Sequence, residues 1–192
     1  VNSITLKTLP ETLKYCADNS FGNIHISEVK IVGKAKENSS ILTIDNNFGI
    51  YKLLYNYHKK YFPRICIDLI DDLIVGYLGM RQQKHKFSCN SMCGNLLQID
   101  YKGDVYVCEN IAPKLYIGNI SNQKISEILL FHEQKINVLS QSIMYCESCK
   151  YYSICRGGCR AYTFSNSGDL FSPHPRCNEI KDLIRLIEKD NK

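Results

Sequence analysis

The stretch 146-CESCKYYSICRGGC-159 decides what kind of fold the second half of this chain can adopt. It places four cysteines in fourteen residues, with the spacing C-x2-C-x5-C-x3-C. Of the chain's 10 cysteines, all but Cys16 and Cys66 lie between Cys89 and Cys177. Without a recognisable export signal, cysteines at this density indicate metal or redox centres rather than disulfides. Eight thiolates suffice for two complete four-cysteine sites.

Four-cysteine sites hold either zinc or iron–sulfur clusters. Paired C-x2-C knuckles are typical of zinc, and here only Cys146 and Cys149 have that spacing. Gly157 and Gly158 would let the backbone approach a cluster closely enough for N–H groups to donate to its sulfurs. The spacing therefore favours iron–sulfur clusters and leaves zinc as the alternative. Three arginines adjoin candidate ligands and either offset the cluster charge or are ordinary surface charges: Arg156, Arg160 and Arg176.

The composition indicates a globular protein and excludes several other classes. The 192 residues suffice for one large or two small domains, and 44% are hydrophobic. The net charge of +5 is mild, and no run of five basic residues occurs, so we expect no nucleic-acid partner. No apolar run is long enough to span a bilayer, so we expect no membrane partner. The chain opens on Val1 with residues typical of a domain interior, so we expect it to be part of a longer protein.

Helix and strand patterns alternate along the first 80 residues. Thr8 and Glu11 have the spacing of a capping box, with Pro10 in the first turn. The expected elements are a helix ending near Asp18, a strand at 23–32, a helix ending before Pro63 and a strand at 64–70. This order predicts part of a parallel α/β sheet.

The pattern changes after about Gly79. Residues 94–108 alternate apolar and polar side chains on both sides of Lys102-Gly103, which predicts a β-hairpin. Residues 125–139 are expected to form an amphipathic helix and 162–175 a polar loop. A last helix is expected at 178–189, with four apolar side chains on its inner face: Ile180, Leu183, Ile184 and Ile187.

The full spacing C-x9-G-x4-C, C-x2-C-x5-C-x3-C and a final cysteine resembles the SPASM domain, the C-terminal extension of radical SAM enzymes that mature peptides and proteins. The matching residues are Cys93, Gly103, Cys108, Cys146, Cys149, Cys155, Cys159 and Cys177. The resemblance implies an α/β fold, with residues 1–80 as closing βα units of a partial radical SAM (β/α) barrel. Residues 81–192 would be the SPASM domain, a β-hairpin plus helices around two auxiliary clusters.

The resemblance also implies which thiols hold each of the two [4Fe–4S] clusters. The first set is Cys89, Cys93, Cys108 and Cys159, and the second is Cys146, Cys149, Cys155 and Cys177. The distance from Cys89 to Cys93 varies in the family, and without Cys89 the first cluster would keep an open iron. Glu109 stands where sulfatase-maturing relatives have an acidic residue proposed as a catalytic base. The alternative for Glu109 is a solvent-facing side chain.

A CxxxCxxC loop, which binds the SAM-cleaving cluster, is not present in this sequence. The resemblance implies a longer oxidoreductase that also binds S-adenosylmethionine and a third [4Fe–4S] cluster, and that modifies a peptide or protein. We expect an external flavodoxin- or ferredoxin-type electron donor and an anaerobic cytoplasm. The bond formed, the substrate and the oligomeric state are not implied. The alternatives are a ferredoxin-like electron-transfer module without catalysis and a zinc-stabilised interaction domain.

Several other residues are interpreted as structural. His132 is expected on the inner side of its helix, and His174 in a loop. Cys16 and Cys66 are expected to be buried thiols. Four aromatic residues flank the candidate ligands and either screen a cluster from water or form the core of the domain: Tyr151, Tyr152, Tyr162 and Phe164.

Overall fold

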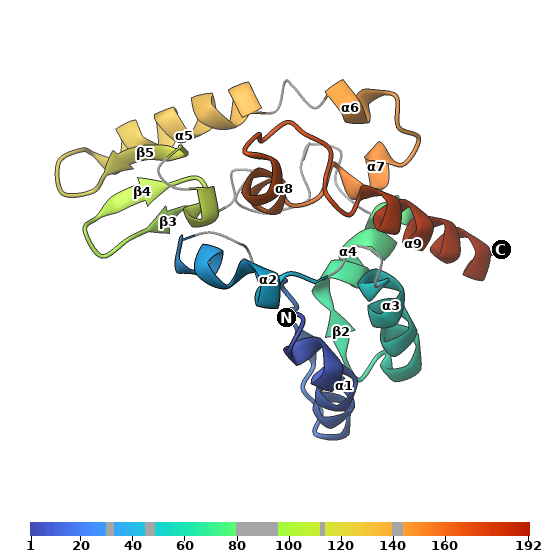
Figure 1. The fold of residues 1–192 in the computed structure, drawn as a ribbon. Helices are drawn as coiled ribbons and strands as arrows, with labels where there is room; N and C mark the ends of the chain where they lie inside the picture. The colour runs from blue at the N-terminus through green and yellow to red at the C-terminus, as the bar shows by residue number, and fades with distance from the viewer. Residues whose placement is uncertain (30–32, 45–48, 80–95, 112–113, 140–143) are drawn as a thin grey trace. The chain divides into compact units, whose positions relative to one another are not determined.

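The computed structural model describes residues 1–29, 33–44, 49–79, 96–111, 114–139 and 144–192 (Figure 1). The chain forms two compact units. The first comprises Val1–Arg81 together with Pro175–Lys192, and the second comprises Gln82–His174. We expect the boundary between the partial barrel and the SPASM domain at residue 80. That boundary rests on resemblance to a family, whereas the two units are defined by contacts within the structure, so the boundary stays a prediction.

The first unit is an α/β arrangement. Its elements are η1 (Thr5–Thr8), α1 (Leu9–Asp18), β1 (Asn23–Ile24), η2 (Gly33–Asn38), α2 (Ser39–Leu42), α3 (Ile50–Tyr61), β2 (Cys66–Ile67), α4 (Asp68–Tyr77) and α9 (Cys177–Asp190). β1 and β2 pair in parallel, with Asn23 opposite Cys66 and Ile24 opposite Ile67. The parallel pairing predicted from the alternation of helix and strand is therefore present.

Both strands of this sheet are shorter than the apolar stretches predicted. β2 ends at Ile67 because Asp68 begins α4 and its carboxylate accepts a hydrogen bond from the Leu69 N–H at 2.8 Å. Asp71 adds a second acidic residue to the first turn of α4, where the helix dipole favours negative charge. A strand predicted over 64–70 is therefore wrong beyond Ile67.

The first helix has the predicted extent but not the predicted cap. α1 ends at Asp18, and Leu13 and Ala17 lie on its buried face. The Thr8 hydroxyl donates to the Thr5 carbonyl at 3.1 Å, so it makes no capping hydrogen bond to α1. The preceding turn η1 supplies that nearby carbonyl, and the capping-box prediction is wrong for this reason.

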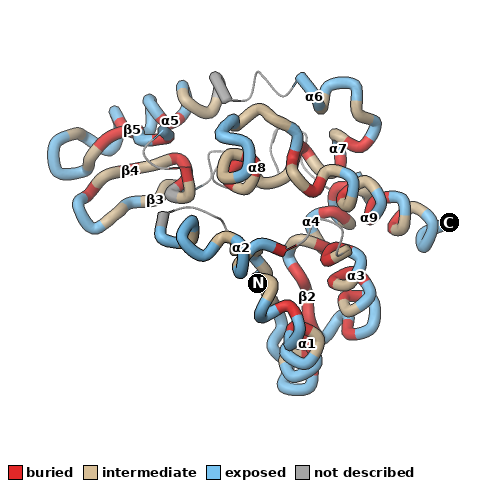
Figure 2. The backbone as a smooth tube through the Cα atoms, in the orientation of Figure 1, coloured by how far each residue is buried: buried red, intermediate tan, exposed pale blue. Residues whose placement is uncertain are grey.

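α9 closes the core of the first unit, where it contacts α3 and α4. The four residues predicted for its inner face are all buried: Ile180, Leu183, Ile184 and Ile187. Figure 2 shows buried and exposed stretches alternating along α9. Ile50 and Leu54 of α3 are buried as well. At the end of α9, Lys59 forms an ion pair with Asp190 at 2.5 Å.

The second unit combines a small antiparallel sheet with short helices. Its elements are β3 (Gln98–Ile99), β4 (Asp104–Tyr106), η3 (Glu109–Ile111), β5 (Tyr116–Asn119), α5 (Ile125–Leu139), α6 (Met144–Glu147), α7 (Tyr152–Cys155) and α8 (Arg160–Ser167). The strand order is β3-β4-β5, and both pairings are antiparallel. α5 contacts β5. The third strand, β5, was not predicted from the sequence.

The turn between β3 and β4 is fixed by Asp100 and Gly103. The Gly103 N–H donates to the Asp100 carbonyl at 3.0 Å, and the Asp100 carboxylate accepts from the N–H groups of Lys102 and Asp104. Gly103 has φ +81°, a conformation that glycine adopts without the Cβ penalty. The turn therefore forms where the alternating pattern and Gly103 predicted it.

The core of the second unit gathers residues from the sheet, η3, α5 and α8. Its buried members are Val105, Val107, Cys108, Ile111, Leu115, Ile117, Ile128 and Ala161, and we call this set the second-unit core. Residues 160–167 are helical, so the polar loop predicted from residue 162 is wrong over its first part. Ala161 and Thr163 give α8 a buried face, and Gly168 ends it at φ +73°. Within the described residues, none of the helices has both the length and the apolar character of a membrane span.

Candidate metal centre

None of the cysteines that the structure describes is in a disulfide. They are Cys16, Cys66, Cys108, Cys146, Cys149, Cys155, Cys159 and Cys177. Cys89 and Cys93, which the first predicted ligand set requires, lie outside the described residues. Cys16 in α1 and Cys66 in β2 are half-buried rather than buried, so that expectation is only partly met. The sulfur atoms of the described candidate ligands are not consumed by disulfide bonds and can therefore serve as metal ligands.

Cys108 joins the sheet to the second-unit core. It follows β4, is 8% exposed, and its carbonyl accepts a hydrogen bond from the Ile111 N–H at 3.1 Å. That bond closes η3, whose first residue is Glu109. The side chain of Glu109 lies outside what the structure describes, so its role as a base stays a prediction.

The segment from Cys146 to Cys155 folds as a series of tight turns. The Cys149 N–H donates to the Cys146 carbonyl at 3.1 Å, and the Tyr152 N–H donates to the Cys149 carbonyl at 2.9 Å. The Cys155 N–H then donates to the Tyr151 carbonyl at 3.0 Å, within α7. Each candidate ligand is thus held by a local backbone hydrogen bond, which keeps three thiols on one short folded segment.

A left-handed turn separates Cys155 from Cys159. Arg156, Gly157 and Gly158 have φ of +49°, +79° and +67°, and the Gly158 N–H donates to the Cys155 carbonyl at 3.0 Å. Cys159 then precedes α8 directly. Gly157 and Gly158 permit this turn, because left-handed backbone carries little penalty without a Cβ. Their predicted close approach to a cluster stays a prediction.

His174 packs against this turn. A Cβ placed on Gly158 would lie 2.8 Å from the Cδ2 atom of His174, which is 7% exposed. The His174 ring also stacks on Tyr162 of α8, with centroids 5.3 Å apart. The prediction of a plain loop residue missed this packing because no local pattern links residue 174 to residue 158.

The arginines beside the candidate ligands are not surface charges. Arg156 is 9% exposed, and Arg160 and Arg176 are each 1% exposed. Arg160 donates through Nη1 to the carbonyls of Leu170 at 3.1 Å and Ser172 at 2.9 Å. Through Nη2 it donates to the Gly157 carbonyl. Burial lowers the pKa of Arg160, whereas three nearby thiols act in the opposite direction: Cys146, Cys159 and Cys155.

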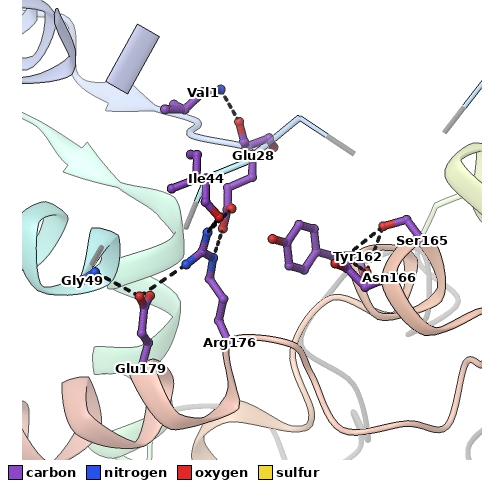
Figure 3. A network of polar contacts seen from close by, with 10 residues as sticks. Val1, Glu28, Ile44, Gly49, Tyr162, Ser165, Asn166, Arg176 and Glu179 are labelled. Atoms are coloured by element: carbon purple, nitrogen blue, oxygen red, sulfur yellow. Dashed lines mark hydrogen bonds and ion pairs between the residues drawn. The ribbon is translucent and has the colours of Figure 1, made fainter. Parts of the chain in front are cut away.

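Arg176 is neutralised within the first unit (Figure 3). Its Nε and Nη2 atoms donate to the two carboxylate oxygens of Glu28, each at 2.6 Å, and its Nη1 atom lies 3.3 Å from a Glu179 oxygen. Nη2 also donates to the Ile44 carbonyl at 3.2 Å, and Glu179 accepts from the Gly49 N–H at 3.0 Å. Although Arg176 precedes Cys177, its charge is thus balanced by two carboxylates.

Aromatic side chains lie among the candidate ligands. Tyr151 is buried, and Tyr152 is half-buried. Burial raises the pKa of Tyr152, and Cys146 and Cys155 act in the same direction, so this ring shares their surroundings. His132 is buried as predicted, and burial lowers its pKa.

The candidate cysteine ligands and the groups beside them are chemically suited to an iron–sulfur cluster. Thiols outside any disulfide, a left-handed glycine turn beside two of them and a buried cation match what a negatively charged tetrathiolate cluster requires. Among the residues that the structure describes, no three Cys, His, Asp or Glu side chains already form a group able to hold a metal ion. Cys177 begins α9, an element of the first unit, while its three predicted co-ligands belong to the second.

Residues 89–160 match a protein family whose description is SPASM, iron-sulfur cluster-binding domain. The chain contains a SPASM domain. That segment includes Cys89, Cys93, Cys108, Cys146, Cys149, Cys155 and Cys159. Cys177 lies beyond the matched residues, so its place in a ligand set stays a prediction.

Two curated relatives carry names from the same enzyme class. The chain is 31% identical over 125 residues to the cysteine-type anaerobic sulfatase-maturating enzyme of Clostridium novyi (strain NT), covering 62% of this chain and 32% of that protein. It is 27% identical over 116 residues to the serine-type anaerobic sulfatase-maturating enzyme of Bacteroides thetaiotaomicron, covering 58% and 27%. The chain thus spans about a third or less of the length of these relatives.

Solved structures of one such protein have the same fold. Native anSMEcpe with bound AdoMet matches with a TM-score of 0.70 at 20% identity, over 100% of this chain and 55% of that one. Native anSMEcpe with bound AdoMet and Cp18Cys peptide matches with a TM-score of 0.65, over 100% and 56%. The SPASM match and the curated relatives, together with this shared fold, support a C-terminal radical SAM/SPASM part.

Proposed function

We propose that this chain carries two auxiliary [4Fe–4S] clusters in a radical SAM enzyme that modifies a peptide or protein. The observation that carries the proposal is the SPASM domain over residues 89–160, which contains seven cysteines, followed by an eighth at Cys177. The names of the two curated relatives support a maturase, and one matching structure holds a peptide. The rest of the enzyme would bind S-adenosylmethionine and a third cluster through a CxxxCxxC loop that this sequence does not contain.

The first proposed ligand set is Cys89, Cys93, Cys108 and Cys159, and the second is Cys146, Cys149, Cys155 and Cys177. The left-handed turn at Gly157 and Gly158 supports the assignment of Cys155 and Cys159 to different sets, because it reverses the chain between them. Bound clusters of this kind supply sites that accept and release single electrons, and an incompletely ligated iron would offer a place for a substrate atom.

The remaining roles belong to side chains of this chain. The thiolates hold the clusters, and the buried ring of Tyr151 and side chain of Ile154 keep water from the segment that bears the second set. Glu109 would accept a proton from the substrate, because it directly follows a proposed ligand. A flavodoxin- or ferredoxin-type protein would supply electrons. Oxygen-sensitive clusters suit an anaerobic cytoplasm.

The cluster proposal is tested by anaerobic reconstitution of the full-length protein with iron and sulfide. Two four-iron clusters predict about eight irons beyond those of the SAM-cleaving site, and a brown protein. Iron absent from the reconstituted protein, with zinc bound instead, would support the zinc-stabilised interaction domain and overturn the proposal.

The substrate class is tested separately. The full-length reconstituted enzyme is incubated with S-adenosylmethionine, a reductant and sulfatase peptides that carry either serine or cysteine at the target position. A change in peptide mass that depends on S-adenosylmethionine supports a sulfatase-type maturase. A fully loaded enzyme that cleaves S-adenosylmethionine but leaves both peptides unchanged excludes these substrates, while the cluster proposal stands on its iron content.

A further inference from the structure

Arg160 is the most deeply buried charged side chain among the described residues of the second unit. Its side chain is 1% exposed, compared with 9% for Arg156. A guanidinium group stays protonated under all ordinary conditions. A full positive charge therefore lies inside the second unit, and burying a charge is unfavourable unless opposite charge or hydrogen bonds offset it.

Backbone carbonyls offset this charge only in part. Arg160 donates to the carbonyls of Gly157, Leu170 and Ser172, while its buried Nε atom has no hydrogen-bond partner. No carboxylate of the described residues forms an ion pair with it. The Arg160 charge contributes to the lowered pKa of Asp169, but hydrogen bonds from Phe171 and Ser172 are the main causes and Arg160 is the weakest. Because backbone carbonyls are neutral dipoles, their hydrogen bonds leave the net positive charge of the Arg160 guanidinium uncompensated.

The groups that can complete the compensation are thiolates. Cys159 precedes Arg160 directly, and both Cys146 and Cys159 pack against the second-unit core, of which Ala161 is a member. Cys155 forms the other end of the turn whose Gly157 carbonyl accepts from Arg160. These thiols come from both proposed ligand sets, since Cys159 belongs to the first and the other two to the second.

We propose that Arg160 is a fixed positive charge that acts on both proposed clusters and raises their reduction potentials. The inference rests on the proposed function. A [4Fe–4S] cluster held by thiolates is negative, and one electron from the external donor makes it more so. A cation in a poorly polarisable interior stabilises that added charge, so the electron-rich state becomes easier to reach. A single charge near ligands of both sets moves both potentials in the same direction.

Arg176 illustrates why Arg160 differs from the other fully buried arginine. Arg176 also adjoins a proposed ligand, but Glu28 and Glu179 already balance its charge. Its field on any neighbouring group is therefore largely cancelled. The missing carboxylate partner, and not burial alone, makes Arg160 available to the clusters.

The test measures the midpoint potentials of the auxiliary clusters in the reconstituted full-length protein by redox titration followed by electron paramagnetic resonance. R160Q keeps a hydrogen-bond donor but removes the charge, and R160K keeps the charge but not the planar fork. K114M is the matched control, because Lys114 is an exposed cation of the same unit, stacked on Phe164 at 4.5 Å. We expect both potentials to fall in R160Q, to fall less in R160K and to stay unchanged in K114M.

The iron content and the potentials of the Arg160 variants each support or overturn the proposed role of the Arg160 charge. R160Q that fails to bind iron while R160K binds it also supports the proposal, because the charge is then what the clusters require. Unchanged potentials in an iron-loaded R160Q overturn it, as does an equal shift in R160K or in K114M. Loss of iron from both Arg160 variants overturns it too, since the side chain's shape would then matter rather than its charge. Wild-type protein without iron would refute the proposed function instead.

Discussion

Replacing Gly158 by alanine should destabilise the second unit through two separate effects. Gly158 has φ +67°, and left-handed backbone costs an alanine roughly 1–2 kcal/mol. The new Cβ would also lie 2.8 Å from His174 Cδ2, a distance that real Cβ atoms do not tolerate. His174 is buried and stacked on Tyr162, so it has little room to move, and overpacking of this kind costs about 1–3 kcal/mol. The expected loss is therefore about 2–5 kcal/mol of unfolding free energy.

Gly168 offers a matched control for the backbone effect alone. Its φ is +73°, but no atom lies within 4 Å of a Cβ built on it. G168A should therefore lose only the roughly 1–2 kcal/mol of backbone strain. Urea denaturation of wild type, G158A and G168A, followed by circular dichroism, gives the three unfolding free energies. Equal losses in the two variants would refute the argument that His174 packs on the turn, and G158A/H174A should recover part of the G158A loss.

Three further predictions concern ligands, a buried ion pair and pH. C149A should lose about four irons from the reconstituted protein, whereas C16A should keep the full content; equal iron in wild type and C149A would contradict the assignment. R176M should lower the unfolding free energy by about 3–5 kcal/mol, because it removes the cation that balances two carboxylates, one of them 15% and the other 16% exposed. R185M breaks an ion pair that is exposed to solvent and should cost under about 1 kcal/mol in the same denaturation assay. Burial first, and then a neighbouring aspartate, raise the pKa of Tyr55 from 10.0 to about 12, so the folded protein holds this proton more tightly than the unfolded chain. Stability from this group is full below pH 10 and is lost as the pH rises through about 12; thermal melts of Y55F should show a smaller decline over that window.

The elements that local pattern could predict are those with a long apolar face or a special turn residue. α5 has the predicted bounds of 125–139, and the inner face of α9 was predicted residue by residue, because a 3.6-residue period over three turns has no competing interpretation. The Lys102-Gly103 turn follows from Gly103. The predictions that failed concern short elements. The strand predicted over 64–70 ends at Ile67, where α4 follows, and residues 162–167 of α8 were assigned to a polar loop because the stretch 162–175 contains Gly168 and two prolines.

Some features of the candidate site could also be predicted from local pattern, and others could not. The type and spacing of its thiols could be predicted from the sequence. Few side chains serve as metal ligands, and the number of residues between cysteines is given directly by the sequence. The neighbours of those thiols could not be predicted in this way. Arg160 and Arg176 are equally buried, yet Arg160 donates hydrogen bonds to backbone carbonyls, whereas Arg176 pairs with the carboxylates of Glu28 and Glu179.

By itself, then, the sequence determined the kind of chemistry, the candidate thiol ligands and the helices whose apolar residues recur with a clear 3.6-residue period. These features depend on residue identity and local spacing. Only the tertiary structure decided which arginine keeps an uncompensated charge, that His174 packs on the Gly157-Gly158 turn, and that α9 packs with α3 and α4 rather than within the second unit. The physical reason is that burial and charge compensation depend on contacts between residues far apart in the sequence, and local sequence patterns do not predict such contacts.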